Sequence, residues 1–454
     1  MRGGIKTTKI VVIGANHAGT AASNTILDNF KDCELTIFDK NSNISFLGCG
    51  MALWIGEQIS KSDGLFYCNK NIFEEKGAKV HMESEVLSVD EDKKTVKVRL
   101  KDGQEVEEVY DKLIIATGST PRSNGLPGED LENIEVAKRF QDAQKVKAIG
   151  QREEIKNVVV VGSGYIGVEL AEAFQRIGKN TTLVTRDEKI LQNYYDHEFS
   201  KDLEDAMAEN GIKLIFNEDV VEFKGEDGKV KQVVTNNSTY DADLVINSIG
   251  FVPNVYLLEN LERHDKTGAY LVDKHFRTSN KDIYAIGDCA TTYYKPTEQQ
   301  EYVALATNAV RSGIVAALNA CGMDIETPGV QGSSGMQIYG HKIVMTGLSL
   351  DLAKKYGIDV EYKDFEDFQK PGFMEDVPNA KVKIRIIYRK DDRRIICAQL
   401  GSTYDVSMGI HMFSLAIQKD VTIDELALTD IFFMPHFNQP YNYITMAALG
   451  AVLK

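Results

Sequence analysis

The chain has few cysteines, and none of them form a short paired motif. Only six occur in 454 residues, and no two are spaced as Cys-x-x-Cys. This pattern argues against a disulphide scaffold and against a zinc site built from cysteine pairs. The six cysteines lie at positions 33, 49, 68, 289, 321 and 397.

Long apolar runs and an excess of positive charge are also lacking. No run approaches the roughly 20 apolar residues of a membrane-spanning helix, and residues 1–6 show no export signal. The net charge of −15 argues against a nucleic-acid partner and against docking on an anionic membrane. We therefore expect a cytoplasmic protein. Its length exceeds that of a single hydrophobic core and predicts two or three domains.

Two glycine-rich turns dominate what is present. The first, residues 14–19, follows the apolar run 10–13, and the second, residues 162–167, follows the run 158–161. Helices are expected to follow at 20–29 and 168–177. In such strand–turn–helix units the glycines let the backbone approach a pyrophosphate, whose charge the helix N-terminus stabilises. The residues expected to contact nucleotides are Gly14, Asn16, His17, Ala18, Gly19, Gly162, Gly164, Tyr165, Ile166 and Gly167.

Each turn opens a similar stretch of chain, and the two starts are offset by 162 − 14 = 148 residues. Both stretches contain an Asp-Gly hairpin signal, at 102–103 and 227–228, and close with similar strands at 110–118 and 240–246. The pattern predicts two copies of a doubly wound α/β unit. Asp39, at the end of the strand 35–39, is placed to accept ribose hydroxyls in the first copy.

A third signal, the apolar run 283–286 followed by Gly287 and Asp288, places a carboxylate where a flavin would be held. It implies a split first domain, with the second unit inserted into it. The expected boundaries are 1–126 and 252–330 for the FAD domain, 127–251 for the NAD(P)H domain and 331–454 for an α+β domain. The charged stretch 126–157 is expected to connect the first two.

The last domain is predicted to contain strands at 382–386 and 394–400 and an amphipathic helix. Met408, Met412 and Leu415 are expected on the apolar face of that helix. The aromatic segment 432–437 is a candidate subunit interface, and a plain domain core is an equally good interpretation.

Cys49 lies in a glycine-rich turn before an expected helix start, where the helix dipole would stabilise its thiolate. In dithiol disulphide reductases a second cysteine follows five residues later, and here that position is Trp54. A single sulfur at this site would cycle through a sulfenic acid or a mixed disulphide. Cys33, Cys321 and Cys397 are expected to be small buried hydrophobes, and Cys68 and Cys289 are further candidates for the same role. His17, within the first turn, is a candidate to move a proton beside Cys49.

Segments 14–20, 43–54 and 432–443 closely resemble those of the water-forming NADH oxidases, and the resemblance extends over the whole chain. These enzymes form a single-cysteine branch of the pyridine nucleotide–disulphide oxidoreductases, related to NADH peroxidase and coenzyme A disulphide reductase. The resemblance implies FAD held by the first turn, Asp39 and Asp288, with Cys49 as the redox sulfur and His17 its neighbour. It also implies that the last domain, 331–454, is a dimerisation domain, that Tyr165 gates the nicotinamide pocket and that Glu169 lies beside the nicotinamide. Further expected cofactor contacts are Lys40, Ala116, Thr117, Gly118, Gly250, Ala306 and Thr307.

The implied reaction reduces O2 to two water molecules with two equivalents of NADH or NADPH. The first equivalent yields peroxide, which the Cys49 thiolate captures as a sulfenic acid, and the second reduces that sulfenic acid. The expected assembly is a homodimer or a dimer of dimers. The alternatives on the same fold are NADH peroxidase, a peroxide-forming NADH oxidase and coenzyme A disulphide reductase. A more remote alternative is a non-catalytic flavoprotein redox sensor.

One departure from the resemblance concerns the nucleotide. After the strand 181–184, NADH-preferring members usually carry an acidic residue, whereas this chain has Thr185 followed by Arg186 and then Asp187. A carboxylate there would accept the ribose hydroxyls and repel a 2′-phosphate, and an arginine would bind that phosphate. We therefore expect NADPH to be used as well as NADH, and Asp187 is a candidate replacement for the missing acid.

Overall fold

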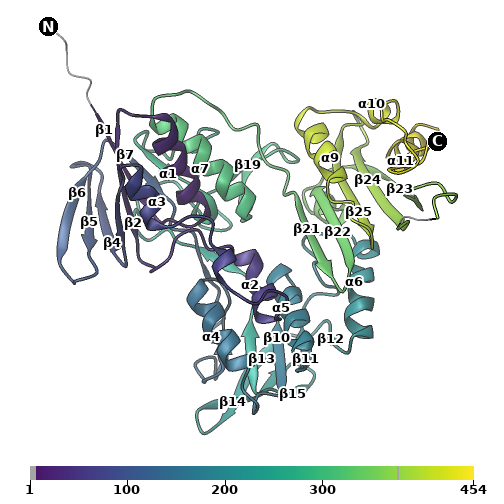
Figure 1. Ribbon diagram of the computed structural model, residues 1–454, viewed down its shortest axis with the longest axis horizontal. Helices are drawn as coiled ribbons and strands as arrows, with labels where there is room; N and C mark the ends of the chain where they lie inside the picture. Colours follow the sequence, from purple (N-terminus) through teal and green to yellow (C-terminus); the bar gives the residue numbers. More distant parts are fainter. Residues whose placement is uncertain (1–6, 376–377, 454) are drawn as a thin grey trace.

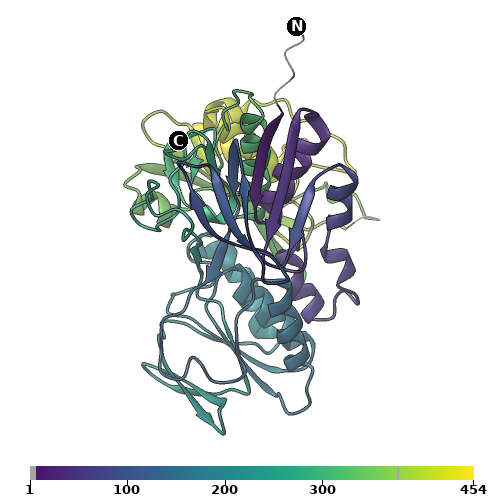
Figure 2. The ribbon, with the colours of Figure 1, turned by 90° about the vertical axis from the view of Figure 1, so that its left-hand side faces the viewer.

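The computed structural model describes residues 7–375 and 378–453 (Figure 1). Residues 1–6, where no export signal was expected, lie outside the described residues. Three units are visible, and Figure 2 shows the first sheet above the second unit. None of the helices in the described ranges is long and apolar enough to cross a membrane.

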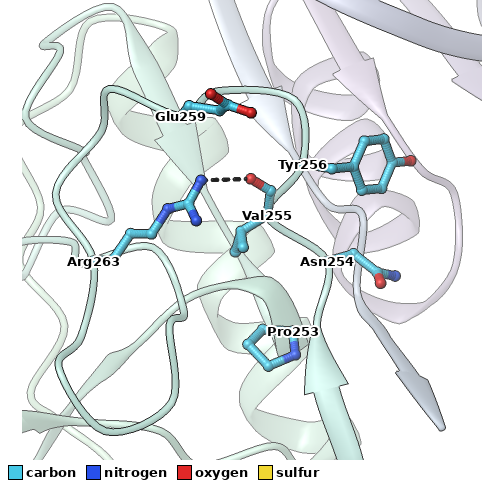
Figure 3. A pocket seen from close by; sticks show the side chains of 6 residues that line it. All are labelled: Pro253, Asn254, Val255, Tyr256, Glu259 and Arg263. Atoms are coloured by element: carbon cyan, nitrogen blue, oxygen red, sulfur yellow. Dashed lines mark hydrogen bonds between the residues drawn. The ribbon is translucent and has the colours of Figure 1, made fainter. Parts of the chain in front are cut away.

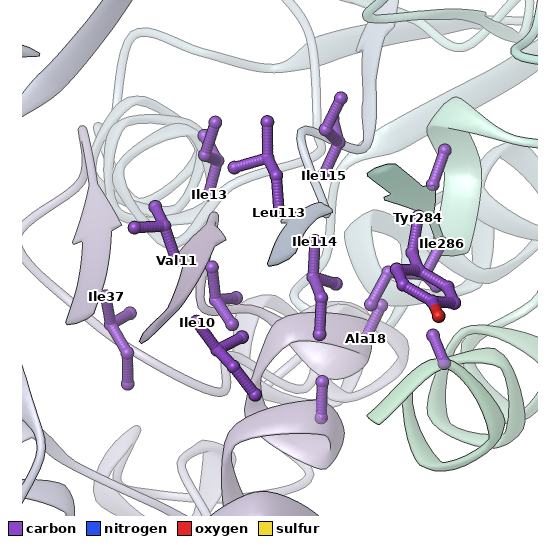
Figure 4. Packing of buried hydrophobic residues seen from close by; sticks show 14 of the residues in the cluster. Ile10, Val11, Ile13, Ala18, Ile37, Leu113, Ile114, Ile115, Tyr284 and Ile286 are labelled. Carbon is purple, nitrogen blue, oxygen red and sulfur yellow. The ribbon is translucent and has the colours of Figure 1, made fainter. Parts of the chain in front are cut away.

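The first unit is a parallel sheet of order β18-β7-β1-β2-β3. Its strands are nearly continuous apolar runs because helices cover them (Figure 4). The strand β18 comes from far along the chain, as the third sequence signal predicted. The main bounds are β1 Thr8–Ile13, α1 His17–Asn29, β2 Cys33–Asp39, α2 Met51–Ile55, α3 Lys70–Glu75, β3 Lys79–Met82, β7 Lys112–Ile115, β18 Ile283–Ala285 and α7 Ala306–Ala320.

The second unit repeats this plan as a parallel sheet of order β12-β11-β10-β16-β9. The stretch expected to be a connection contains a strand of this sheet, β9, and a helix, α4. The charged residues of this stretch obscured the helical pattern of the sequence. The buried side chains of the helix recur at positions 143, 146 and 149. The bounds are β9 Ile134–Glu135, α4 Phe140–Gly150, β10 Asn157–Val161, α5 Tyr165–Arg176, β11 Asn180–Val184, α6 His197–Glu209, β12 Lys213–Ile215 and β16 Leu244–Asn247.

Both Asp-Gly hairpins are confirmed, each within a three-stranded antiparallel sheet. Asp227 and Gly228 form a two-residue loop and both have positive φ, at 52° and 77°, as a type I′ turn requires. The strands are β4 Glu85–Asp90, β5 Thr95–Arg99, β6 Glu105–Val109, β13 Val220–Glu226, β14 Lys229–Thr235 and β15 Thr239–Asp241. Short pairs link the units: β8 Ser119–Pro121 with β17 Phe251–Pro253, and β19 Thr292–Tyr294 with β20 Gln299–Glu301.

The third unit is an antiparallel sheet of order β21-β22-β25-β24-β23 with helices packed on it. Both strands expected from the sequence, here β24 and β25, are confirmed as an antiparallel pair. The bounds are β21 Ser334–Ile338, β22 His341–Gly347, α8 Leu350–Lys355, β23 Val360–Phe368, β24 Lys381–Arg389, β25 Ile395–Ser402, α9 Gly409–Gln418, α10 Ile423–Ala427 and α11 Tyr443–Val452.

The apolar face predicted for α9 was wrong for Met408 and Leu415, whereas Met412 packs against the core as expected. The helix buries residues 410, 413 and 417 against the sheet, whereas Met408 is 74% exposed and Leu415 is 57% exposed. Both faces of this helix carry apolar side chains, so periodicity alone did not reveal which face packs against the core. Residues 432–434 and 437 are also exposed, which favours the interface interpretation of the aromatic segment over a buried core.

The helix starts and the cysteines also differ from expectation. The helix α1 begins at His17 and α5 at Tyr165, three residues before the predicted starts, because the end of each glycine turn is already helical. Cys33 and Cys321 are only partly buried. Cys68, Cys289 and Cys397 are buried, as expected.

The close packing of α1 on α7 depends on Gly313. A Cβ at this position would collide with the carbonyl oxygen of Ala18 and would lie 3.0 Å from the backbone nitrogen of Ala22. We expect Gly313→Ala to lower the free energy of unfolding by about 1–3 kcal/mol, because α7 must move away from α1. Thermal and denaturant unfolding measure this. Ile314→Ala, at an exposed position of the same helix, should change it by less than about 0.5 kcal/mol, and a stabilised Gly313→Ala would contradict the packing argument.

Candidate active site

The first glycine turn is fixed by backbone contacts that exclude side chains. A Cβ at Gly14, whose φ is 97°, would collide with the carbonyl oxygen of Ala116. The turn is also bound to Asp39, whose carboxylate accepts a hydrogen bond of 2.6 Å from the N–H of Ala15. Burial raises the pKa of Asp39 above its ordinary value. The end of β2 and the turn are therefore joined directly.

The second glycine turn has the same geometry. A Cβ at Gly162 would lie 2.6 Å from the carbonyl oxygen of Ser248, and one at Gly167 would collide with the carbonyl oxygen of Gly162. At Gly164, in contrast, a Cβ would meet no heavy atom within 4 Å. The middle glycine therefore faces open space.

The expected nucleotide-discriminating residues lie at the end of β11, beside this turn. Thr185 is buried, and its hydroxyl lies 3.0 Å from that of Ser163. The Ser163 hydroxyl also donates to the Asp187 carboxylate at 3.2 Å. Arg186 is exposed and makes no ion pair within the described part of the chain. The acidic group beside the turn is thus that of Asp187, with a free arginine next to it.

Cys49 lies in a short 3₁₀ turn, Gly48–Gly50, directly before α2. Its thiol is exposed, but desolvation by the surrounding protein and then the charge of Glu169 raise its pKa. The expectation of a stabilised thiolate was therefore wrong for the protein chain alone. The reason is that desolvation and Glu169 outweigh the opposing effects of a backbone hydrogen bond and Lys138. The helix α2, with only five residues, also has a weak dipole.

The cysteine meets the second unit because α2 packs on α5. A Cβ at Gly56, the residue after α2, would lie 2.8 Å from the Cα of Ala173 in α5. The same helix α5 carries Glu169, whose pKa burial and the nearby Glu172 raise to about 7. The sulfur of the first unit and the carboxyl group of the second therefore influence each other electrostatically.

His17 is the first residue of α1, and it contacts Tyr67. The Nδ1 atom of His17 lies 3.0 Å from the Tyr67 hydroxyl, and the two rings are stacked. Burial lowers the pKa of His17, although the charge of Asp288 opposes this. Burial raises the pKa of Tyr67 to about 12. Ser45, with φ 61°, holds this segment in place, because its hydroxyl accepts the backbone N–H groups of Tyr67 and Cys68.

Asp288 is placed near His17 and Cys49 and is bound to a residue that the sequence did not reveal. Its carboxylate accepts hydrogen bonds of 2.8 Å from both Lys138 Nζ and the Ser119 hydroxyl. Burial alone would raise the pKa of Asp288, but the charge and hydrogen bond of Lys138 outweigh it and hold that pKa below its usual range. Lys138 comes from the stretch expected to be a mere connection, where a lysine among charged residues gives no sequence signal.

The remaining predicted residues line the surroundings of this centre. Thr117 and Asn254 are joined by two hydrogen bonds, of 2.7 and 2.8 Å. Tyr165 donates to the Ser334 hydroxyl at 2.6 Å, which connects α5 with the third unit. Others are placed as follows: Ala116 and Gly118 after β7, Gly250 before β17, Ala306 and Thr307 at the start of α7, Ile166 and Ala18 in the first turns of their helices, and Lys40, exposed, after β2.

An open hollow of about 480 Å³ lies beside the Thr117–Asn254 link (Figure 3). Its lining residues are Pro253, Asn254, Val255, Tyr256, Glu259 and Arg263. The Arg263 guanidinium donates to the Val255 carbonyl oxygen at 3.0 Å. None of these residues was predicted to be part of a site.

The fold and these contacts define a class of protein, one with two dinucleotide-binding folds that meet at a single cysteine. Residues 8–313 match the pyridine nucleotide-disulphide oxidoreductase family, and residues 337–442 match the dimerisation domain of that family. The chain belongs to the pyridine nucleotide-disulphide oxidoreductases. This confirms the predicted fold class, two nucleotide-binding folds followed by a dimerisation domain.

Similarity to named proteins extends over 98% of this chain. An NADH oxidase of Streptococcus pyogenes is 53% identical, over 98% of this chain and 99% of that protein. The water-forming NADH oxidase from Lactobacillus brevis, bound to NADH, is 37% identical with a TM-score of 0.94, over 98% of each chain. An engineered variant of that enzyme, a water-forming NADPH oxidase bound to NADPH, gives the same identity, coverage and TM-score.

Replacing Glu169 with Gln is expected to lower the pKa of Cys49 and to speed the reaction of its thiol with iodoacetamide. The negative charge of Glu169 opposes the thiolate. Because the Glu169 carboxyl has a pKa of about 7, wild type and variant should react alike at lower pH and diverge above that value. Alkylation rates of the Cys49 peptide, measured by mass spectrometry from about pH 6 to 10, test this. Glu188→Gln, an exposed position of the same unit, serves as the control, and superimposable profiles for Glu169→Gln would contradict the prediction.

Proposed function

We propose that this chain is a water-forming NAD(P)H oxidase, which uses FAD and Cys49 to reduce O2 to two water molecules with four electrons. The names of its similar proteins support oxidation of NADH. The observation that carries the rest is the single thiol placed between the two nucleotide folds. Residue 54, where a dithiol enzyme would carry its second cysteine, is a tryptophan, so a Cys-x4-Cys disulphide cannot form here.

The residues of the first unit fit FAD. A nucleotide pyrophosphate would lie at the first glycine turn and the start of α1, and Asp39 would accept the adenosine ribose hydroxyls. Asp288 would hold the middle of the cofactor, and Lys138, which is bound to that carboxylate, would add a positive charge there. When bound, FAD supplies the transfer of electrons from a nicotinamide to the second acceptor.

Cys49 acts as the peroxide trap in this proposal. Its thiolate attacks one oxygen of H2O2, the O–O bond breaks, and the products are a sulfenic acid and hydroxide, which takes up a proton to become water. Two electrons and a proton then convert the sulfenic acid back to thiolate and a second water. Because the pKa of Cys49 is raised in the protein chain, more of the sulfur becomes thiolate as pH rises. The attack on H2O2 is therefore expected to become faster with rising pH.

His17 is assigned the proton transfer. Because burial lowers its pKa, the imidazole is neutral near pH 7 and carries a single ring proton that it can donate. Tyr67, with a pKa of about 12, keeps its hydroxyl proton, and its hydroxyl donates a hydrogen bond to Nδ1 of His17. The ring proton of His17 is then on Nε2, the nitrogen directed away from Tyr67.

The second unit is proposed to accept both NADH and NADPH. The Asp187 carboxylate, bound to the turn through Ser163, provides an acceptor for ribose hydroxyls, and the exposed Arg186 provides a cation for a 2′-phosphate. The engineered NADPH oxidase offers a parallel, because its five substitutions include Asp to Ala and, at the next residue, Ala to Arg. The exposed aromatic segment of the third unit is proposed to form a homodimer interface.

The ratio of oxygen to nicotinamide tests the proposed function directly. Wild type is expected to consume one O2 per two NADH, with no effect of catalase, because Cys49 removes the peroxide. Cys49→Ser should approach one O2 per NADH and release H2O2, whereas Cys33→Ser should behave as wild type. A ratio of one in the wild type would indicate a peroxide-forming enzyme. An absence of oxygen uptake would indicate a peroxide or disulphide acceptor, and absence of turnover with those would indicate a redox sensor.

Nucleotide preference tests the assignment of Arg186. Arg186→Ala is expected to lower kcat/KM for NADPH by about 10- to 100-fold, since a charge-assisted hydrogen bond contributes about 1.5–3 kcal/mol. The value for NADH should stay within about twofold, as should both values in Arg152→Ala, an exposed arginine of the same unit. Steady-state kinetics with each nucleotide provide the measurement. A several-hundredfold preference of the wild type for NADH, with NADPH turnover unaffected in Arg186→Ala, would overturn the assignment.

A further inference from the structure

Two cysteines outside the active site lie in contact, although 288 residues separate them in the chain. The Sγ atoms of Cys33 and Cys321 are 3.6 Å apart. Cys33 is the first residue of β2, and Cys321 directly follows α7. Both are partly buried. Nothing in the sequence associates them, and we expected each to be a small buried hydrophobe.

The fold brings these two thiols together for a reason that does not involve the redox sulfur. The strand β2 and the helix α7 belong to the first unit, but their segments are separated by the whole second unit. The helix α7 packs closely on α1, where Gly313 permits backbone contact, and α1 leads directly toward β2. The end of α7 therefore lies at the start of β2, at the end of the unit opposite Asp39, which closes the same strand.

We propose that Cys33 and Cys321 are a peroxide-sensitive modification site, at which the two thiols are oxidised to a disulphide that ties the two segments of the first unit together. The oxidant is a hydroperoxide, with H2O2 as the simplest. One thiolate attacks a peroxide oxygen, the O–O bond breaks, and a sulfenic acid and hydroxide result. The second thiolate attacks the sulfenic sulfur, the S–S bond forms and a second hydroxide leaves. Two thiols and one H2O2 thus give one disulphide and two waters.

The other cysteines do not offer this chemistry. Cys289 and Cys397 have no exposed surface, and Cys68 is buried. Among the described residues, Cys33 and Cys321 are the pair of thiols in contact. Burial raises the pKa of both Cys33 and Cys321, so the reaction is expected to be slow at neutral pH and faster at alkaline pH. The disulphide is therefore expected to form during sustained exposure to peroxide and not in each catalytic turnover.

A disulphide here would close a very long loop. It would enclose the second unit and fix the end of α7 to β2 in the unfolded chain as well as the folded one. In the chain-entropy account, long loops give large stabilisation. The oxidised protein is therefore expected to unfold at a higher temperature than the reduced one.

The decisive experiment uses the full-length flavin-loaded protein with Cys49→Ser, so that the active-site sulfur does not consume the oxidant. The protein is treated with a small excess of H2O2 near pH 8, its free thiols are blocked with N-ethylmaleimide, and it is digested with trypsin. Residues 32–40 and 312–342 form two tryptic peptides, each with one cysteine. The expected product is these two peptides joined, lighter than their sum by two hydrogens, with a Tm raised by about 3 °C or more and reversed by dithiothreitol.

Cys33→Ser and Cys321→Ser, each combined with Cys49→Ser, are the matched controls and should show neither the joined peptides nor the rise in Tm. The flavin absorbance of each variant reports whether it is folded. The proposal is overturned if both peptides carry N-ethylmaleimide after peroxide treatment, if either cysteine ends as a sulfinic acid, or if the cross-link forms without a change in Tm. None of these readouts depends on the oxygen stoichiometry, so this proposal and the oxidase proposal fail separately.

Discussion

The contact of a glycine turn with the end of the neighbouring strand is the constraint on which the rest of the structure depends. It occurs twice, at Gly14 against Ala116 and at Gly162 against Ser248. In each unit the approach is too close for any side chain, so the helix that follows begins at a fixed place and direction relative to the sheet. A larger residue would push the turn away and move the helix N-terminus, which is the group that recognises phosphate. The two nucleotide sites are therefore set by backbone geometry, and side chains only refine them.

From these two fixed helices the electrostatics of the centre follow. The first helix begins with His17, and the second carries Glu169 one turn further on. Between them lie Cys49 and the pair formed by Lys138 and Asp288. In the protein chain the negative charge of Glu169 and desolvation disfavour the thiolate, and Lys138 opposes them in part. The pKa of the sulfur therefore depends on residues of both units.

Sequence patterns predicted the parts of this protein that are local. The glycine turns, the Asp-Gly hairpins and the terminal strand pair each depend on residues close together in the chain, and the structure confirms them as structural elements. What could not be predicted depends on contacts between segments that are far apart in the chain. Lys138 gives no signal until it lies against Asp288, and Gly56 matters only because Ala173 lies against it. The raised pKa of Cys49 and the contact of Cys33 with Cys321 are of the same kind, since both arise from residues far apart in sequence.

The single-sulfur chemistry proposed for Cys49 is also supported by packing at Trp54. The indole of Trp54 stacks on Phe140 of α4 with ring centroids 5.7 Å apart, and its backbone carbonyl accepts a hydrogen bond of 2.8 Å from Lys147. These contacts fix α2 between α4 and α5. A cysteine at position 54 would give up the stacking, which contributes about 0.5–1.5 kcal/mol beyond area burial, and would loosen the helix that positions Cys49. Replacing the second thiol by an indole thus has two linked effects: it removes the partner for a disulphide, and it holds the remaining sulfur against the second unit.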